Sequence, residues 1–345
     1  MNDDDTQLQI VLAEPGRFEI TETPAPVAGA GEALVRIRHI GVCGTDIHAF
    51  HGRQPFFEYP RILGHELGGE VMAAPEGSGL QPGDIVAVEP YLNDPQSPAS
   101  RRGKTNCCEQ LQVLGVHCDG GMRSVIAVPV EKLHCSDSLT TEQLALVEML
   151  CIGRHAVERA QVEPDEFALV IGAGPIGMSV IQFLQTKTRR VAVADLSEER
   201  LAFCREGLGV DLTLSSGGPD PVDPALRDLS GCGELPTVIF DATGHPGSMM
   251  STFELAANGG RIVFVGLFQG EVRFDDPNFH RRELTLMSSR NATGADFREV
   301  IGAIERGDVD TTPWITHRMR LAEVPERFAE TIASPDLRKA VISVE

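Results

Sequence analysis

Hydrophobic and polar residues alternate in the first part of the chain, with a period of two. Ala33, Val35 and Ile37 alternate with Arg36 and Arg38, which is typical of a strand with one buried face. The turn sequence Gln81–Asp84 precedes another apolar run, Ile85–Val88. Short strands broken by glycine and proline therefore predict a β-rich domain up to about residue 150.

The pattern changes after Pro164, where short apolar runs alternate with helix-like stretches. The runs FALVI, RRVAVAD, PTVIFDAT and GGRIVFVG are uniformly hydrophobic at their centres, as buried parallel strands are. A helical stretch is expected from about Gly177 to Lys187, and a second begins at Ser197, a plausible N-cap followed by two glutamates. This alternation predicts a doubly wound parallel sheet.

The length of 345 residues favours two domains over one. We expect residues 1–150 to form the β-rich domain and 151–286 to form the doubly wound α/β domain. The alternation lapses from about residue 287, so 287–345 are expected to return to the first domain. The fold class is therefore α/β with an additional β-rich domain.

The charge balance excludes several classes of partner. A formal net charge of −20 argues against binding to nucleic acid or to an anionic membrane. No signal peptide or membrane-spanning run is recognised, and the cysteine spacing does not suggest a disulfide framework. We therefore expect a cytoplasmic protein with a small-molecule substrate. The acidic, lysine-poor composition fits a solvated surface, and salt adaptation remains an open alternative.

The segment GVCGTDIHAFHGRQPFFEYPRILGHE contains the strongest candidate chemistry. Cys43, His65 and Glu66 offer sulfur, nitrogen and oxygen donors in one stretch, a mixed set that fits catalytic zinc better than structural zinc. Thr45 and His48 in the same segment are suited to proton transfer. A single buried cysteine or histidine is usually core packing, but the combination favours a metal site.

A second motif, GAGPIG, follows the run FALVI. It fits the G-x-G-x-x-G fingerprint of a dinucleotide site, and its context of strand, glycine turn and helix makes the assignment specific. Asp195 ends the next strand and is placed to bind the ribose hydroxyls. Its charge repels a 2′-phosphate, and Leu196 and Ser197 provide no compensating arginine, so NAD is expected rather than NADP. The predicted cofactor-binding residues are Gly172, Gly174, Pro175, Ile176, Gly177, Asp195, Val265 and Leu267.

The Cys…Gly-His-Glu segment upstream of this fingerprint resembles the zinc-dependent medium-chain dehydrogenases, the alcohol and polyol dehydrogenase superfamily. The resemblance covers essentially the whole chain. It implies a GroES-like catalytic domain and a Rossmann domain, one catalytic zinc, NAD, and a homodimer or homotetramer. It also implies Cys43 and His65 as zinc ligands.

The same resemblance assigns roles to the neighbouring residues. Glu66 is a ligand or a near neighbour that exchanges with water. Glu148 is the third ligand or a water-bridged partner, and the choice between Glu66 and Glu148 stays open. Asp46 matches the carboxylate that orients the zinc histidine. Thr45 and His48 match the relay that carries the substrate proton to solvent.

One departure from the family concerns a second, structural zinc. Relatives commonly carry four cysteines on a lobe, where this chain has Asp94, Ser97, Ser100 and Cys108. Two hydroxyl groups cannot replace thiolates as ligands. We therefore expect the structural zinc to be absent.

The substrate expectation rests on the same resemblance. Segments such as HRRELTLMSSRNAT are similar to the branch acting on polyols and hexonic acids, with L-gulonate, L-galactonate or L-idonate 5-dehydrogenases as the nearest type. Arg290 matches an arginine beside the zinc-site glutamate of sorbitol dehydrogenases. It binds substrate hydroxyls or a carboxylate, or it is a structural partner of Glu148. Arg154 is a weaker candidate for the carboxylate.

Alternative functions have different sequence requirements. A neutral polyol dehydrogenase of the sorbitol type shares the whole motif set. A catalytically idle, nucleotide-binding regulatory relative has no need of the full set of zinc-site residues, and the Gly-His-Glu triplet speaks against a zinc-free quinone reductase.

Overall fold

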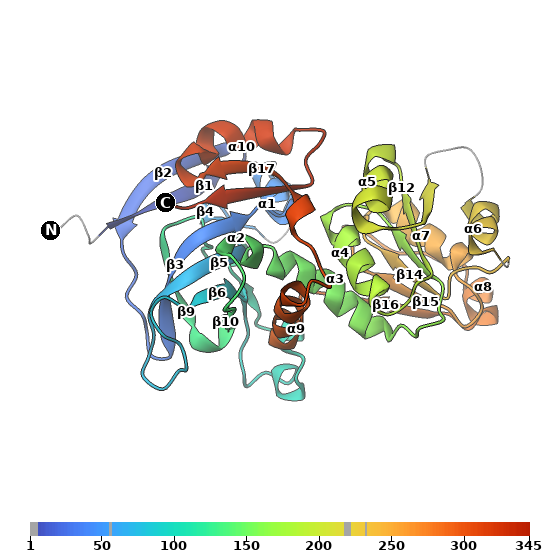
Figure 1. The fold of residues 1–345 in the computed structure, drawn as a ribbon, viewed down its shortest axis with the longest axis horizontal. Coiled ribbons are helices and arrows are strands. Elements are labelled where there is room, and N and C mark those ends of the chain that lie inside the picture. The colour runs from blue at the N-terminus through green and yellow to red at the C-terminus, as the bar shows by residue number, and fades with distance from the viewer. Residues whose placement is uncertain (1–5, 55–56, 217–221, 232) are drawn as a thin grey trace. The chain divides into compact units, whose positions relative to one another are not determined.

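The computed structural model describes residues 6–54, 57–216, 222–231 and 233–345. By its internal contacts the chain divides into two compact units (Figure 1). The first comprises residues 1–149 and 292–345, and the second comprises residues 150–291. The division falls inside helix α3 (Val147–Ala160). No helix among the described residues is both long and apolar enough to cross a membrane.

The described residues of the first unit form mainly strands, which make up three sheets. One sheet has the order β2-β1-β4, a larger one runs β10-β6-β5-β3-β18-β17 with β9 paired to β3, and β7 pairs with β8. The strands are β1 (Thr6–Glu14), β2 (Arg17–Pro24), β3 (Glu32–Gly41), β4 (Arg61–Ile62), β5 (Glu66–Ala73), β6 (Ile85–Val88), β7 (Tyr91–Leu92), β8 (Gln112–Val113), β9 (Val125–Pro129), β10 (Leu133–Cys135), β17 (Ile315–Arg320) and β18 (Lys339–Ser343).

Strands from the N-terminal and C-terminal parts of the chain pair in this unit. Strand β18 pairs antiparallel with β3 and parallel with β17, so red and blue ribbons lie together in Figure 1. The helices of the unit are α1 (Gly44–Phe50), α2 (Thr141–Leu144), α9 (Gly294–Glu305) and α10 (Val324–Ile332).

The predicted alternation in β3 is confirmed by its burial. Ala33, Val35 and Ile37 are buried, whereas Arg36 is exposed and Arg38 is half-buried. The buried face contributes to a core that also receives Val86 from β6 and Ile342 from β18.

The second unit is a doubly wound sheet of six parallel strands, as the alternation of strands and helices predicted. Its order is β13-β12-β11-β14-β15-β16, and β11, β12 and β14 are buried at every position. The strands are β11 (Ala168–Ile171), β12 (Val191–Asp195), β13 (Leu212–Ser215), β14 (Val238–Asp241), β15 (Arg261–Phe264) and β16 (Thr285–Ser288); the helices are α4 (Pro175–Gln185), α5 (Glu198–Leu208), α6 (Val222–Ser230), α7 (Pro246–Leu255) and α8 (Asp276–Arg281).

Helix α5 begins where the sequence predicted. The Ser197 hydroxyl accepts a hydrogen bond from the Arg200 amide, and Glu198 and Glu199 occupy the first turn, where the helix dipole favours negative charge. Gly209 ends the helix in the left-handed conformation, with φ of 65°.

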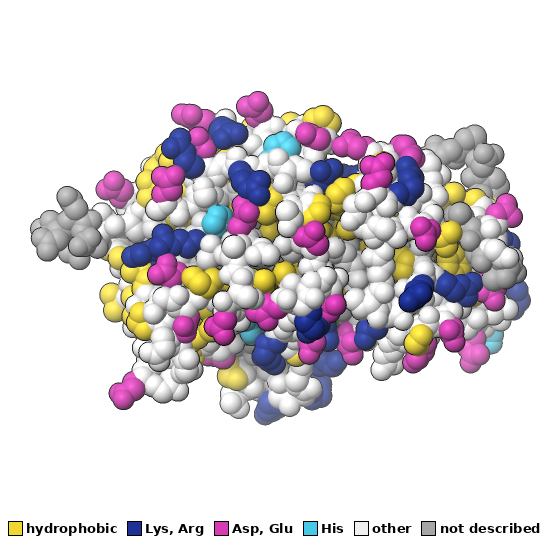
Figure 2. All heavy atoms as spheres, viewed as in Figure 1, with side chains coloured by type: hydrophobic (Ala, Val, Ile, Leu, Met, Phe, Trp, Pro, Cys, Tyr) yellow, Lys and Arg dark blue, Asp and Glu magenta, His cyan; other side chains and the backbone are white. Residues whose placement is uncertain are grey.

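Acidic side chains are distributed over the face shown in Figure 2 and are interspersed with lysine and arginine side chains. Several of them form exposed ion pairs, including Arg320 with Glu323 and Arg318 with Glu142. Such pairs contribute little to stability because water screens them. They fit the interpretation of the acidic composition as a solvated surface.

Candidate active site

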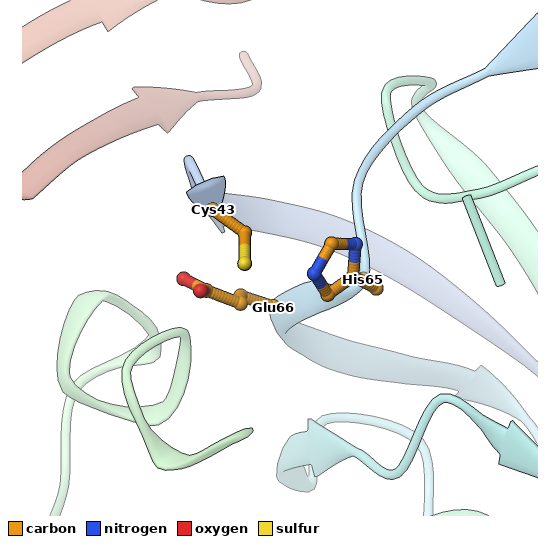
Figure 3. A group of neighbouring side chains, drawn as sticks. All are labelled: Cys43, His65 and Glu66. Carbon is orange, nitrogen blue, oxygen red and sulfur yellow. The ribbon is translucent and has the colours of Figure 1, made fainter. Parts of the chain in front are cut away.

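Two neighbouring strands bring the predicted metal ligands together. Strand β3 ends at Gly41, which is paired with Glu66, the first residue of β5. Cys43 follows β3 as the N-cap of α1, and His65 immediately precedes β5. One ligand atom from each of Cys43, His65 and Glu66 lies within 4.8 Å of the others. Figure 3 shows the three side chains converging.

Gly41 makes room for this arrangement. A Cβ atom at Gly41 would lie 2.0 Å from Oε2 of Glu66 and 3.1 Å from the carbonyl oxygen of Ala145. Any other residue would therefore displace the Glu66 carboxylate. The strand pairing and the missing side chain together place the carboxylate beside Cys43.

Two of the three ligand residues are buried, and the group holds polar atoms that lack hydrogen-bond partners among the described residues. His65 and Glu66 are 5% and 0% exposed, and Nδ1 of His65, Oε1 of Glu66 and Oδ1 of Asp46 have no hydrogen-bond partner in the part of the chain that the structure describes. Unsatisfied buried polar atoms are costly, and a cation would satisfy those of the ligands. Thiolate, imidazole and carboxylate are all donors that zinc accepts, so these residues fit a zinc ion.

The electrostatics of the group favour a cation. Burial raises the pKa of the Asp46 carboxyl group, although His65 opposes this change. Burial alone lowers the pKa of His65, but the charges of Asp46 and Cys43 outweigh it and hold that pKa well above its ordinary value. Asp46 Oδ2 accepts a hydrogen bond from the Cys43 amide at 2.9 Å, and its Oδ1 lies 3.7 Å from Nδ1 of His65.

Lys339 at the start of β18 is part of this environment, and the sequence analysis did not identify it. It is 2% exposed, forms an ion pair with Glu66, and donates to the carbonyl oxygen of Val42 at 3.0 Å. Burial lowers the pKa of Lys339, but Glu66 and Cys43 outweigh this effect and raise it overall. Lys339 thus neutralises part of the negative charge around the ligand group.

Replacing Lys339 by methionine should destabilise the zinc-free protein by about 3–5 kcal/mol, because the Glu66 carboxylate is left buried without a counter-ion. Zinc supplies positive charge at the same carboxylate, so the loss should be smaller in the zinc-loaded protein. Urea unfolding of both forms measures the difference, with Lys339→Arg as the charge-conserving control. An equal loss with and without zinc would contradict this role.

Glu148 lies on α3 and has a different partner. It is 6% exposed, and its Oε1 accepts a hydrogen bond from the Tyr91 hydroxyl. Burial raises the pKa of Glu148 to about 7, with Glu66 adding to the rise and His65 opposing it. Among the described residues, the ligand group within 4.8 Å contains Glu66 and not Glu148.

The two relay candidates lie on α1, directly after Cys43. Thr45 is half-buried and His48 is exposed. Thr45 follows Cys43 by two residues, and the exposed His48 lies about one helical turn further along α1. The arrangement can support the predicted proton transfer, and the roles of both residues stay predictions.

The lobe that carries structural zinc in relatives is held by hydrogen bonds among the replacement residues. The Ser97 hydroxyl donates to that of Ser100 at 3.0 Å, and the Asp94 amide donates to Sγ of Cys108 at 3.3 Å. Burial raises the pKa of Cys108, but hydrogen bonds, chiefly with Ser97, outweigh it and hold the pKa below its ordinary value. The absence of a second zinc stays a prediction.

The glycines of the fingerprint have distinct steric roles. Gly172 has φ of +94°, and a Cβ at Gly177 would lie 1.7 Å from the carbonyl oxygen of Gly172. A Cβ at Gly174 would meet only Nη1 of Arg200, at 3.9 Å. The space beside the Gly174 backbone is therefore open to a ligand. Gly174 is the N-cap of α4 and Pro175 occupies its first turn. The first turn of a helix offers unpaired amide groups to a phosphate, so these residues fit a pyrophosphate.

Asp195 ends β12 and faces the fingerprint. Its carboxylate accepts hydrogen bonds from the amides of Ala173 at 2.6 Å and Ser197 at 2.8 Å. Arg200, in the first turn of α5, has Nη1 at 3.9 Å from Oδ2 of Asp195. The prediction from sequence rests on Leu196 and Ser197 and leaves out Arg200, although helical spacing from Ser197 could have indicated it.

The remaining predicted residues lie at the ends of strands or on α3. Val265 follows β15 and donates its amide to the carbonyl of Asp241 at 2.9 Å, while Leu267 is 75% exposed. Arg290 is exposed and follows β16 in the second unit. Glu148 belongs to the first unit, so the pairing of Arg290 with Glu148 stays a prediction. Arg154 lies 3.8 Å from Glu158 in an ion pair.

Comparison with protein families identifies both units. The family model described as "Alcohol dehydrogenase GroES-like domain" matches residues 29–137. A second, described as "Zinc-binding dehydrogenase", matches residues 175–306.

Individual proteins are similar over nearly the full length. L-galactonate-5-dehydrogenase of Escherichia coli K12 is 40% identical over 97% of this chain and 98% of its own. The 2-dehydro-3-deoxy-L-galactonate 5-dehydrogenase of Pseudoalteromonas atlantica is 30% identical over 94% of this chain and 95% of its own. A crystal structure from E. coli CFT073, described as a short chain alcohol dehydrogenase (rspB) with NADH, superimposes with a TM-score of 0.89, 28% identity and coverage of 98% and 99%.

Proposed function

The chain belongs to the zinc-dependent medium-chain dehydrogenases, the alcohol and polyol dehydrogenase superfamily, and from this we propose that it oxidises a secondary alcohol of a sugar acid with NAD. The observation that carries the proposal is the convergence of half-buried Cys43 with buried His65 and Glu66 in a chain that also has a dinucleotide fingerprint. A regulatory relative without catalysis has no need of this ligand group.

The first unit holds the metal and handles the proton. Cys43, His65 and Glu66 are the three protein ligands, with Asp46 beside His65 and Lys339 balancing the charge of Glu66. Zinc bound there supplies Lewis acidity, lowering the pKa of an alcohol hydroxyl from about 16 toward about 7. Thr45 accepts the alcohol proton, and His48 transfers it to solvent. We assign Glu66 rather than Glu148 as the third ligand because only Glu66 lies in the group.

The second unit binds the cofactor. The N-terminus of α4 receives the pyrophosphate, and the carboxylate of Asp195 accepts hydrogen bonds from the ribose hydroxyls. NAD held by these residues would supply the hydride acceptor, so that oxidation of the secondary alcohol would give a carbonyl product, NADH and a proton.

Replacing Asp195 by asparagine should lower the preference for NAD over NADP, measured as the ratio of the two kcat/KM values, by about 10–100-fold. The charge-assisted hydrogen bond to the ribose is lost, and so is the repulsion of a 2′-phosphate, for which Arg200 then becomes a partner. Initial rates with both cofactors measure the ratio. Asp211→Asn, an exposed aspartate of the same unit, should leave it unchanged. A wild-type enzyme that prefers NADP would refute the assignment of Asp195.

We propose a hexonate of the L-galactonate or L-gulonate type, oxidised at C5, as the substrate. The support is the 40% identity to a protein that acts on L-galactonate. Arg290 is proposed to bind the carboxylate of the hexonate bidentately.

A panel of hexonates and neutral polyols, with NADH formation as the readout, tests this proposal. The proposal predicts the highest kcat/KM on a hexonate. Sorbitol or xylitol exceeding every hexonate would instead identify a neutral polyol dehydrogenase. The absence of zinc-dependent turnover on the whole panel would favour the regulatory relative.

A further inference from the structure

Tyr91 is a buried tyrosine whose hydroxyl meets a carboxylate at the edge of the ligand group. It begins β7 and is 2% exposed. Its hydroxyl donates to Oε1 of Glu148, which is itself 6% exposed. A carboxylate buried this deeply needs a donor or a cation, and the Tyr91 hydroxyl is such a donor.

The backbone and ring of Tyr91 are fixed independently of Glu148. Strand β7 pairs with β8, with Tyr91 opposite Val113. The ring packs edge-on against Phe297 at a centroid distance of 6.3 Å. Tyr91 therefore cannot follow Glu148 if the carboxylate moves.

The chain on both sides of Tyr91 is anchored by one buried lysine. Lys132 Nζ donates to Glu89 at 2.6 Å and to Asn93 at 2.8 Å, and these residues precede and follow Tyr91 by two positions. The network places the hydroxyl at a fixed point beside α3.

Glu148 lies near the ligands but outside their group. Cys43, His65 and Glu66 form the set within 4.8 Å of one another. Glu148 lies in the first turn of α3, three residues after Ala145. The carbonyl oxygen of Ala145 and Oε2 of Glu66 lie 3.1 Å and 2.0 Å from the position that a Cβ atom at Gly41 would take. A carboxylate at this position competes for a metal ion unless another partner holds it. Catalytic zinc sites use three protein ligands and keep one position open.

We propose that Tyr91 is a positioning residue that holds Glu148 out of the metal's coordination shell and so keeps the fourth position open for substrate. This inference rests on the proposed zinc site. The hydroxyl of Tyr91 prevents Glu148 from becoming a fourth protein ligand of the metal.

Replacing Tyr91 by phenylalanine tests the proposal through metal exchange. Without the hydroxyl, Glu148 turns to the metal, so zinc release to a chelator should slow by about tenfold and kcat should fall by about 10–100-fold. In the cobalt-substituted protein the visible spectrum should shift, because the ligand set changes. A structural defect would have the opposite effect on the metal, since a loosened site releases zinc faster.

Two further variants complete the design. Tyr59→Phe is the matched control, because Tyr59 is the other tyrosine of the chain and its hydroxyl donates to the carbonyl of Ala49; zinc release should stay at the wild-type rate. In the double variant Tyr91→Phe/Glu148→Gln the weakly ligating amide should return zinc release to the wild-type rate.

Glu148→Gln alone keeps the proposal testable if Tyr91→Phe does not fold. It should release zinc at the wild-type rate, because Glu148 contributes no ligand in the wild type. Release more than tenfold faster in Glu148→Gln, or unchanged or faster release in Tyr91→Phe, would overturn the proposal. Failure of the zinc site itself has a different signature, since the wild-type protein would then retain no zinc.

Discussion

Cys43→Ser should lose zinc and at least about 1000-fold in turnover, because a serine hydroxyl is a poor substitute for a thiolate ligand and an alcohol without a Lewis acid keeps a pKa near 16. Cys43 is half-buried at the N-terminus of α1, and serine is a favourable N-cap residue. The variant should therefore fold. Metal analysis and NADH formation measure the two losses.

Cys118→Ser provides the control for the loss of a thiol. Cys118 is also half-buried in the first unit and lies outside the ligand group. It should retain both zinc and turnover. A Cys43→Ser protein that kept its zinc and its rate would show that this thiol is not a ligand.

Gly177→Ala should destabilise the second unit by about 3 kcal/mol or more and abolish cofactor binding. The added methyl group would lie 1.7 Å from the Gly172 carbonyl oxygen, and the backbone of the turn must move to accept it, which exceeds the usual cost of overpacking. Thermal unfolding measures the stability, and quenching of protein fluorescence by NADH measures binding.

Gly174→Ala separates the two effects. Its methyl group meets only the end of Arg200, at 3.9 Å, so stability should change by less than about 1 kcal/mol. NADH affinity should still fall, because the methyl group occupies the approach of the pyrophosphate. Equal losses of stability in the two variants would contradict the steric account of the third glycine.

The fold class and the family resemblance are confirmed. Both could be predicted because the motifs that carry them are local in sequence. The fingerprint joins one strand to the following helix, so its spacing alone fixes its geometry. Uniform burial of β11 and β12 likewise follows from continuous apolar runs. Cys43, His65 and Glu66 come together because adjacent strands carry them.

The residues that the sequence analysis missed act over longer separations. Lys339 reaches Glu66 only because β18, at the other end of the chain, pairs with β3. No local pattern distinguishes that lysine from a surface lysine. Tyr91 looks like an ordinary core aromatic, and its hydroxyl acquires a role only because α3 places Glu148 beside it. Sequence spacing could not decide whether Glu66 or Glu148 is the third ligand, because the place of Glu148 also depends on how α3 packs.

The measurement that tests the central claim most directly is zinc-dependent NADH formation from L-galactonate. Protein stripped of metal by a chelator should be inactive, and about one equivalent of zinc per chain should restore turnover in the wild type but not in Cys43→Ser. Turnover that is indifferent to the chelator and to added zinc would contradict the claim that the group formed by Cys43, His65 and Glu66 performs this chemistry.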